Sequence, residues 1–368
     1  MKKLIIRALA GLLASVVLVA CVSLMGNMPG GKRTDGIFYE ASGIHPDATL
    51  MTVNKQPVTA EEFLYWLAYD CDYLSSYMGG NVDFSTAVGG NMTYGQYALE
   101  DAQRTVTLYA VVRNWAQKAG IELSQESQAQ LDAQRQQYVT YYGGEAGYAK
   151  QLELMGLTDE GFQQINQVYF LYSELYKAYC AAGGALRPSD EEIAAFAQSG
   201  GYCTFLPLYW SITGDEATDA ATLAQAQEAA ARLRSAEGVT AAYLQIAQEL
   251  ALQASETGET AAVQDLDSSV AAVLTALAEG QVSDVVTTAN GYYVFVGQAL
   301  NADAVLDKMF NAKLDAMRES AGIRYNCRSY DKLNVARFYT KLQTLRSQLS
   351  SAGTDGNTSA GTDTAPQS

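Results

Sequence analysis

A short segment in which a helical pattern gives way to two β-type runs constrains this chain most. Apolar residues recur at helical spacing over residues 270–277, and the pattern stops at Gly280. Residues 282–288 then have the composition of a short strand, Asn290-Gly291 that of a turn, and residues 292–296 that of a second strand. This order predicts an antiparallel strand pair beside a helix, and therefore an α+β domain.

The N-terminus has the pattern of an export signal. Met1-Lys2-Lys3 and Arg7 are basic, and an apolar run follows that ends in Leu18-Val19-Ala20-Cys21. This ending resembles the lipobox of bacterial lipoproteins, which implies that Cys21 becomes the lipid-modified first residue. The alternative is a single N-terminal transmembrane anchor, because the apolar run extends to Met25. Both readings place the chain on the outer face of the bacterial cytoplasmic membrane.

Charge is distributed unevenly along the chain, whose formal net charge is −16. Between Pro188 and Asp307 there are 17 acidic residues, and Arg232 and Arg234 are the only basic ones. Residues 308–350 have the opposite balance, with nine basic and three acidic residues. So acidic a chain is not expected to bind nucleic acid.

Residues that bind metals or act as nucleophiles are few. His45 is the only histidine and lies in a lead-in that contains Gly and Pro, which argues against a His-based triad or a zinc enzyme. The cysteines beyond Cys21 form no CxxC pair, so we expect no metal and no cofactor. Disulfides and free thiols both remain open for these residues, which are Cys71, Cys180, Cys203 and Cys327.

Helix-start signals and periodicity organise the rest of the chain. Thr59 with Glu62, and Ser189 with Glu192, have the spacing of capping boxes that open helices. Residues 51–58 and 202–213 are predicted strands, and residues 79–95 are a predicted loop. Further helices are expected to end at Gly120, to start near Ser124, to start at Thr158, and to cover 219–235, 239–252, 302–320 and 329–349.

Two parts of the chain resemble known families. The 268–300 unit resembles the C-terminal half of parvulin-type peptidyl-prolyl isomerases (PpiC or rotamase domains). The opening Val53-Asn54-Xaa-Xaa-Pro57-Val58-Thr59-Xaa-Glu61-Glu62-Phe63 resembles the N-terminal helical domain of SurA- and PrsA-like foldases. The resemblance implies an α+β fold, in which a helical chaperone-like domain is completed by C-terminal helices and a parvulin-like β-α-β domain is inserted.

The implied domain boundaries follow from this resemblance and from the composition. They are a lipoprotein signal peptide at 1–21, a flexible tether at 22–48, a helical SurA-N-like domain at 49–187, a parvulin-like domain at 188–300, C-terminal helices that pack on the N-terminal domain at 301–350, and a disordered tail at 351–368.

The resemblance also implies the positions of the parvulin pocket, although the family's polar cluster is replaced. Ser211 and Tyr293 stand where the family has two histidines, and Gln253 stands where it has Cys or Asp. Leu266 and Val270 fall on the apolar floor that receives proline, and Thr288 is kept. The scaffold positions that persist are Leu277, Gly280, Ser283, Thr288 and Gly291.

Tyrosine is abundant, with 24 residues, and helical spacing groups several of them after residue 158. Tyr169, Tyr172 and Tyr176 lie on this stripe. Packing between helices is one reading of the stripe, and a cradle that contacts unfolded chains is the other.

These features predict a membrane-anchored extracytoplasmic chaperone or foldase that assists the folding of exported proteins. Its partners would be unfolded or nascent exported proteins and, through Cys21, the membrane. The parvulin-like domain is expected to be weakly active or inactive, because its histidines are replaced. The alternatives are an active peptidyl-prolyl cis-trans isomerase and an accessory surface lipoprotein with one specific partner.

Overall fold

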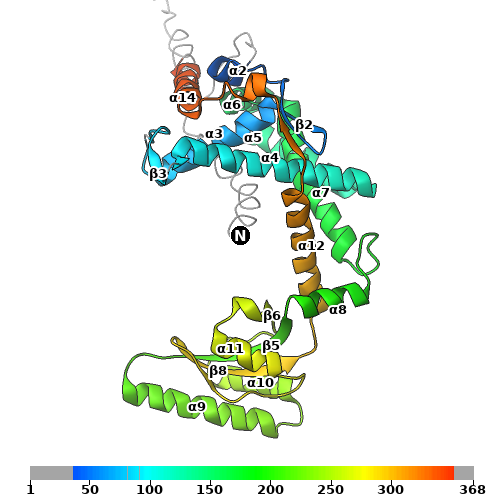
Figure 1. The fold of residues 1–368 in the computed structure, drawn as a ribbon, viewed down its shortest axis with the longest axis vertical. Coiled ribbons are helices and arrows are strands. Elements are labelled where there is room, and N and C mark those ends of the chain that lie inside the picture. The colour runs from blue at the N-terminus through cyan, green and yellow to red at the C-terminus, as the bar shows by residue number, and fades with distance from the viewer. Residues whose placement is uncertain (1–35, 81, 91, 352–368) are drawn as a thin grey trace, which may run out of the picture. The chain divides into compact units, whose positions relative to one another are not determined.

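The computed structural model describes residues 36–351, apart from residues 81 and 91. The chain folds into two compact units (Figure 1). Unit 1 joins the described residues up to Lys177 with those from Leu314 onward, and unit 2 is Ala178–Lys313. Helices are combined with small antiparallel sheets, so the α+β class expected from the sequence is confirmed.

A small sheet in unit 1 joins distant parts of the sequence. Strands β1 (Thr49–Val53) and β2 (Gln56–Thr59) form a hairpin where one short strand was expected, and its turn residues Asn54 and Lys55 have φ values of 50° and 72°. Strand β9 (Ile323–Tyr325) pairs with the other edge of β1. The sequence analysis missed β9, because three residues are too few to establish a periodicity.

Two long helices supply much of the core of unit 1. Helix α3 (Ala60–Tyr77) starts where expected, and the Thr59 side chain accepts a hydrogen bond from the Glu62 N–H. The reciprocal half of the expected capping box is not formed, because the Glu62 carboxylate instead pairs with Arg113 at 2.8 Å. Helix α4 (Tyr94–Ala119) ends, as predicted, at Gly120, whose φ is 65°.

The rest of unit 1 differs from the expectation in two elements. The expected loop at 79–95 contains a short hairpin, and an additional helix follows the helix that was expected to start near Ser124. The elements are β3 (Ala87–Gly89), β4 (Met92–Thr93), α5 (Gln125–Tyr141), α6 (Glu145–Met155) and α7 (Asp159–Cys180). Arg135 of α5 connects the next two helices by ion pairs to Glu145 and Asp159 at 3.0 and 2.7 Å.

Part of the expected flexible tether is folded. Helix α2 (Ile37–Ser42) lies between Gly36 and Gly43, and Phe38 is fully buried against Phe338 with ring centroids 6.0 Å apart. Phe338 belongs to α14 (Val335–Ser351), which follows the short helix α13 (Cys327–Tyr330). The two glycines therefore mark the ends of a short helix with a buried apolar face. Burial of these side chains offsets the conformational entropy that the segment loses on folding.

A charged cluster attaches α14 to α3 within unit 1. The Arg346 guanidinium donates to both carboxylate oxygens of Asp72, at 3.0 and 2.9 Å, and to the carbonyl of Leu154 at 2.8 Å. The Tyr339 hydroxyl also donates to Asp72, at 2.7 Å. Both contacts to Asp72 come from Nη1 of Arg346, and both charged side chains are about one-fifth exposed or less, so this ion pair is poorly screened by solvent.

Unit 2 is built on a four-stranded antiparallel sheet in the order β6-β5-β8-β7. Its elements, in chain order, are α8 (Asp190–Ser199), β5 (Tyr202–Ser211), α9 (Glu216–Ser235), α10 (Val239–Glu249), β6 (Glu259–Ala262), the 3₁₀ turn Val263–Asp265, α11 (Ser268–Ala276), β7 (Val286–Thr287), β8 (Gly291–Gln298) and α12 (Ala302–Glu319). The capping box of Ser189 and Glu192 is formed as predicted.

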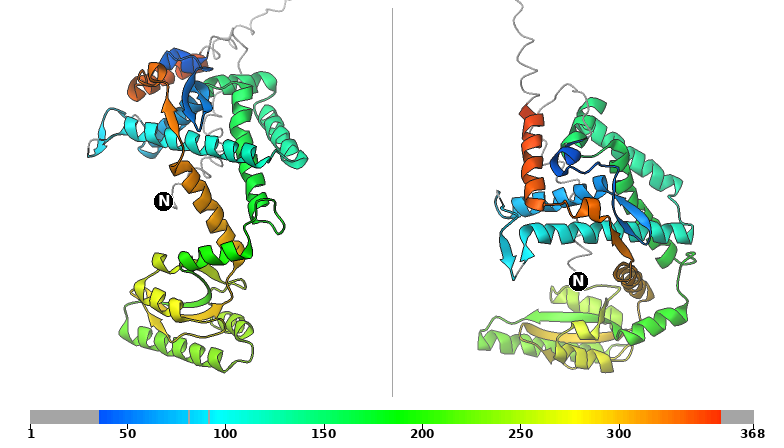
Figure 2. Two further views of the ribbon diagram at one scale, coloured as in Figure 1. Left: turned by 45° about the vertical axis from the view of Figure 1, so that its right-hand side comes forward. Right: turned by 45° about the horizontal axis from the view of Figure 1, so that its top comes forward.

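The two faces of this sheet are covered by different helices (Figure 2). Leu206 and Leu208 of β5 pack with Val294 and Val296 of β8 against α9 and α10. On the other face, Phe205 and Phe295 pack with residues of α11. The alternation of side chains along a strand therefore separates a core on one face from a second, smaller apolar cluster on the other.

Some of the predicted features fall on residues outside the described ranges, and others concern cysteines and membrane-spanning helices. Cys21 and residues 352–368 of the expected tail lie outside the described residues. Cys71, Cys180, Cys203 and Cys327 are described, and they form no disulfide with one another. Within residues 36–351, no helix is both long and apolar enough to cross a bilayer.

The Asp72–Arg346 pair gives a test of how α14 is held. We expect Arg346→Ala to lower the free energy of unfolding of unit 1 by about 2 kcal/mol, because it leaves the Asp72 carboxylate without its cation. Urea unfolding of the single and double variants Asp72→Asn and Arg346→Ala would measure this. Additive losses in the double-mutant cycle would show that the two side chains are not coupled.

Candidate functional site

A pocket of about 990 Å³ lies in unit 2, at the end of β5. Strands β5 and β8, the start of α11 and the segment of residues 251–255 contribute to its walls. Alternate residues of a strand point to the same face of the sheet, and this explains one side of the pocket. Four alternate residues of β5 line it, namely Phe205, Pro207, Tyr209 and Ser211.

Aromatic rings form one wall of the pocket. Tyr209 and Tyr293 are opposite each other on β5 and β8, with ring centroids 4.7 Å apart. Tyr293 is stacked on Phe295, with centroids 5.5 Å apart and an interplanar angle of 7°. Phe295 in turn meets the ring of Phe205 edge to face at 5.5 Å. The wall therefore offers a continuous apolar surface that carries two hydroxyl groups at its outer end.

The floor of the pocket is aliphatic. Val270 of α11 is 8% exposed and packs with Phe205 and Phe295, and Leu266 packs on the same cluster. Asp267, between them in sequence, caps α11 by accepting from the N–H of Ser269 at 2.9 Å. This cap fixes the direction in which α11 leaves the pocket, and with it the position of Val270.

The β7–β8 turn forms the rim next to Tyr209. Thr288 Oγ1 donates to the carbonyl of Gly291 at 3.0 Å and accepts from the N–H of Asn290 at 3.3 Å. The hydroxyl of Tyr209 donates to the carbonyl of Asn290 at 2.8 Å. Thr288 therefore closes the turn, and its hydroxyl is already engaged there.

Hydroxyl groups of tyrosine and serine line the site together with the carboxylates of Glu259 and Asp267. Burial raises the pKa of Tyr293, and the neighbouring Tyr209 and Glu259 raise it further. Burial also raises the pKa of Tyr243, and Glu259 adds to this, although a hydrogen bond from the Ser255 N–H opposes it. Both phenols are consequently neutral at physiological pH, so they can donate hydrogen bonds but cannot serve as general bases.

The structure brings together all the positions predicted from the family resemblance. Ser211, Gln253, Leu266, Val270, Thr288 and Tyr293 line this one pocket. Ser211 and Gln253 are exposed at its rim, whereas Val270 is buried in its floor. The described residues that line the pocket include no histidine, cysteine, lysine or arginine. The described lining therefore offers no imidazole and no thiol.

Sequence reasoning missed other lining residues. The period of two along a strand could have found Tyr209 from Ser211 and Phe295 from Tyr293. No local signal identifies Tyr243, which lies on α10 in the core of the opposite face. Its hydroxyl donates to the carbonyl of Pro207 at 3.2 Å and so reaches the pocket at the edge of the sheet.

The tyrosines predicted to contact unfolded chains are not in this pocket. Tyr169, Tyr172 and Tyr176 lie on α7. Tyr169 is 46% exposed and contacts the neighbouring Phe170 edge to face, while Tyr172 and Tyr176 are half-buried. Their role in binding remains a prediction.

A comparison with family models matches one part of the chain. Residues 214–307 match the model described as the PPIC-type PPIASE domain. This range contains the positions from Gln253 to Tyr293, whereas Ser211 lies three residues before its start. A comparison with curated proteins gives no match.

Solved structures of foldases are similar to parts of this chain at low identity. PrsA from Bacillus subtilis is 15% identical, covering 65% of this chain and 91% of that chain with a TM-score of 0.27. PrsA from Bacillus cereus, a peptidylprolyl isomerase, is 12% identical over 78% and 95%, with a TM-score of 0.26. One of two SurA-like chaperones of Campylobacter jejuni is 12% identical over 76% and 98%, with a TM-score of 0.18.

Gly291 is needed for the strands to meet beside the pocket. A Cβ at this position would lie 2.1 Å from the carbonyl oxygen of Trp210, a backbone atom that cannot move aside alone. We expect Gly291→Ala to destabilise unit 2 by about 3 kcal/mol. Gly280→Ala is the matched control, because a Cβ there meets no atom within 4 Å and φ is +74°. Its expected cost is about 1 kcal/mol.

Thermal unfolding of both variants would measure these differences. Equal stability of Gly291→Ala and Gly280→Ala would contradict the close approach of β5 and β8.

With the sheet, the pocket and the match of residues 214–307 taken together, unit 2 contains a PPIC-type PPIase domain.

Proposed function

We propose that the chain is a membrane-anchored, extracytoplasmic foldase-like chaperone, whose parvulin-like domain binds polypeptide and isomerises proline weakly or not at all. The observation that carries this proposal is the composition of the pocket. Leu266 and Val270 form an apolar floor, and by the resemblance Ser211 and Tyr293 stand where the family has histidines.

The chemistry of proline isomerisation explains why the composition matters. The barrier of about 18–20 kcal/mol arises from amide resonance, which is lost as the bond twists. A catalyst lowers it by holding the proline ring in an apolar site and by stabilising the twisted amide with groups placed around its carbonyl. The floor and the aromatic wall supply the first requirement. Neutral tyrosine and serine hydroxyls supply the second only in part.

The same surface is suited to binding without catalysis. Aromatic side chains give large contact areas at a small entropic cost, and their hydroxyls hydrogen-bond to peptide groups. Tyr209 is 37% exposed and Tyr293 is half-buried, so both remain accessible from the pocket. Tyr169, Tyr172 and Tyr176 of α7 are proposed as a further contact surface for unfolded chains, supported by the exposure of Tyr169.

An active isomerase is the second candidate function. It is favoured by the retained apolar floor and by Tyr293, whose raised pKa keeps its hydroxyl protonated beside the floor. A protonated phenol could donate to the substrate carbonyl.

An assay with proline-containing tetrapeptides and an aggregation assay together separate these candidates. We expect the wild-type chain to suppress aggregation of an unfolded exported protein and to leave the isomerisation rate close to that of buffer. The double variant Ser211→His/Tyr293→His is expected to raise the rate by about tenfold or more, because it introduces imidazole groups, which exchange protons near neutral pH, at two pocket positions. Efficient isomerisation by the wild-type chain would establish the second candidate instead.

The anchor is proposed from the sequence pattern at Leu18-Val19-Ala20-Cys21. We expect the wild-type chain to partition with membranes and to incorporate a labelled fatty acid when produced in bacteria. Cys21→Ser should abolish the incorporation, since the thiol is the site of attachment. A Cys203→Ser variant controls for other thiols, and labelling of Cys21→Ser would contradict the proposal. The domain boundaries at 49–187, 188–300 and 301–350 are likewise proposed on the resemblance.

A further inference from the structure

Strand β5 has unequal neighbours along its length. On one side it pairs with β8 from Thr204 to Ser211. On the other side it pairs with β6 only from Tyr202 to Phe205. From Pro207 to Ser211, one edge of β5 therefore has no strand partner among the described residues.

The backbone groups at this free edge follow from the antiparallel pattern, in which alternate residues direct both N–H and C=O to the same side. The Pro207 carbonyl accepts from Tyr243 of α10 at 3.2 Å, on the side away from β8. Ile212 has the opposite parity, and its N–H donates to Asn290 on the β8 side at 3.3 Å. Tyr209 and Ser211, which share the parity of Pro207, therefore direct their N–H and C=O groups to the free edge.

This edge opens into the pocket. Pro207, Tyr209 and Ser211 line it from one side, and Gln253 and Ala254 line it from the other. The Tyr243 hydroxyl also accepts from the N–H of Ser255 at 3.3 Å, so it bridges the two sides at Pro207. The space between these two sides is a groove, and the Tyr243 hydrogen bonds close one end of it. Along the rest of the groove, β5 presents the N–H and C=O groups of Tyr209 and Ser211, which are two donors and two acceptors.

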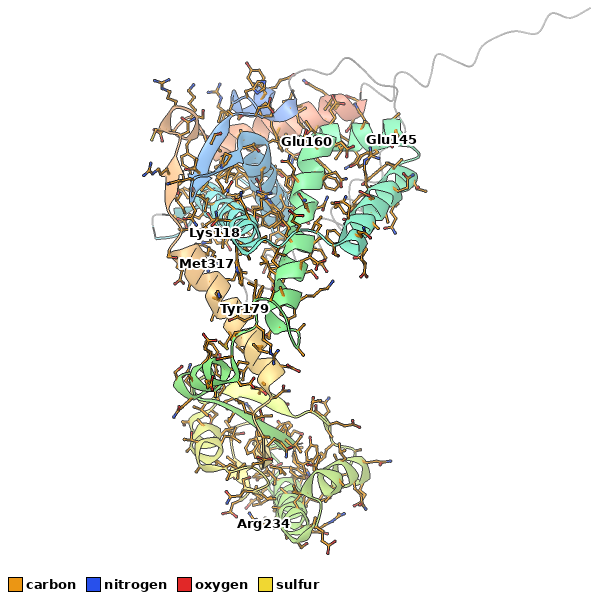
Figure 3. The ribbon with its side chains drawn as sticks, turned by 90° about the vertical axis from the view of Figure 1, so that its right-hand side faces the viewer. Lys118, Glu145, Glu160, Tyr179, Arg234 and Met317 are labelled. Atoms are coloured by element: carbon orange, nitrogen blue, oxygen red, sulfur yellow. The ribbon has the colours of Figure 1, made fainter. Side chains whose placement is uncertain are left out.

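The charge of the pocket selects the sign of its ligand. Glu259 and Asp267 are the charged residues among the described lining residues. The acidic segment from Pro188 to Asp307 has two basic residues, and both form ion pairs with carboxylates outside the pocket. Arg232 pairs with Glu249 at 2.6 Å and Arg234, labelled in Figure 3, with Asp284 at 2.5 Å. No cation in this segment is therefore left to neutralise the carboxylates at the pocket.

We propose that a separate polypeptide segment in extended conformation, carrying Lys or Arg, binds as an added strand along β5 at Tyr209 and Ser211. Its alternate side chains would contact the wall of Tyr209, Tyr293 and Phe295, and its cations would face Glu259 and Asp267. This inference rests on the proposed function in one respect, that the ligand is polypeptide.

An extended peptide matches the site because its own N–H and C=O groups alternate with the period of the free edge. The acidic lining disfavours nucleic acid and acidic peptides. Exposed strand edges also promote aggregation, and natural sheets protect them with proline and short lengths. Here Pro207 and the Tyr243 hydroxyl restrict the accessible edge to a short segment, which is consistent with a binding site.

A proline substitution tests the edge directly. Ser211→Pro removes an N–H that faces the groove and leaves the β5–β8 ladder intact, and Pro207 already occupies the same edge. Ser211→Ala removes the hydroxyl and keeps the N–H. The probe is a fluorescein-labelled nine-residue peptide with Lys at alternate positions and one Ala-Pro step, and binding to the full chain is followed by anisotropy. We expect Ser211→Pro to bind it about fivefold or more weakly than Ser211→Ala does.

The charge requirement is tested with a second peptide, in which Glu replaces every Lys. We expect the wild-type chain to prefer the Lys peptide by about fivefold at low salt and to lose most of this preference near 1 M salt, where the Debye length is about 3 Å. Glu259→Gln with Asp267→Asn should reduce the preference in the same way. Asn at position 267 remains an effective helix cap.

The outcomes separate this inference from the proposed function. Equal binding by Ser211→Pro and Ser211→Ala would overturn strand addition, as would unchanged amide exchange of residues 207–213 in the wild-type chain when the Lys peptide binds. Suppression of aggregation without binding of either peptide would also overturn it, while leaving the chaperone proposal intact. Peptide binding without suppression of aggregation would instead contradict the chaperone proposal.

Discussion

The pairing of β5 with β8 is the interaction on which unit 2 depends. Its eight-residue register sets Ser211 opposite Gly291 and Tyr209 opposite Tyr293. Because side chains alternate, the same register directs Leu206 and Leu208 into the core beneath α9 and α10. A shift by one residue would exchange the core and pocket faces. The absence of a side chain at Gly291 permits the close approach at the end where the pocket lies.

By the family resemblance, Ser211 and Tyr293 stand at positions where histidine is expected. Imidazole groups exchange protons near neutral pH, whereas a phenol whose pKa is raised by burial stays protonated. The stack of Tyr293 on Phe295 extends the apolar wall. The described lining thus combines an aromatic wall with hydroxyl groups, and the free edge of β5 places backbone N–H and C=O groups beside it.

Local signals predicted the elements that depend on a few neighbouring residues. The Asn290-Gly291 turn, the cap at Ser189 and the helix end at Gly120 each have a local physical cause, and each is found. Predictions failed where distant partners compete for a group. Glu62 pairs with Arg113 and so does not complete the capping box at Thr59. Strand β9 exists because β1 offers it an edge, which no pattern within three residues can indicate.

The candidate site divides in the same way. Ser211, Gln253, Leu266, Val270, Thr288 and Tyr293 could be located from the sequence, because helix and strand order carried their positions over from a resembling family. The sequence alone determined the acidic balance, the lack of histidine in unit 2 and the alternation of β5. Only the tertiary structure decided that Tyr243 reaches the pocket from α10 and that the pairing of β5 with β6 ends at Phe205, leaving the rest of that β5 edge free. Both depend on contacts between residues far apart in the chain, and local propensities do not encode them.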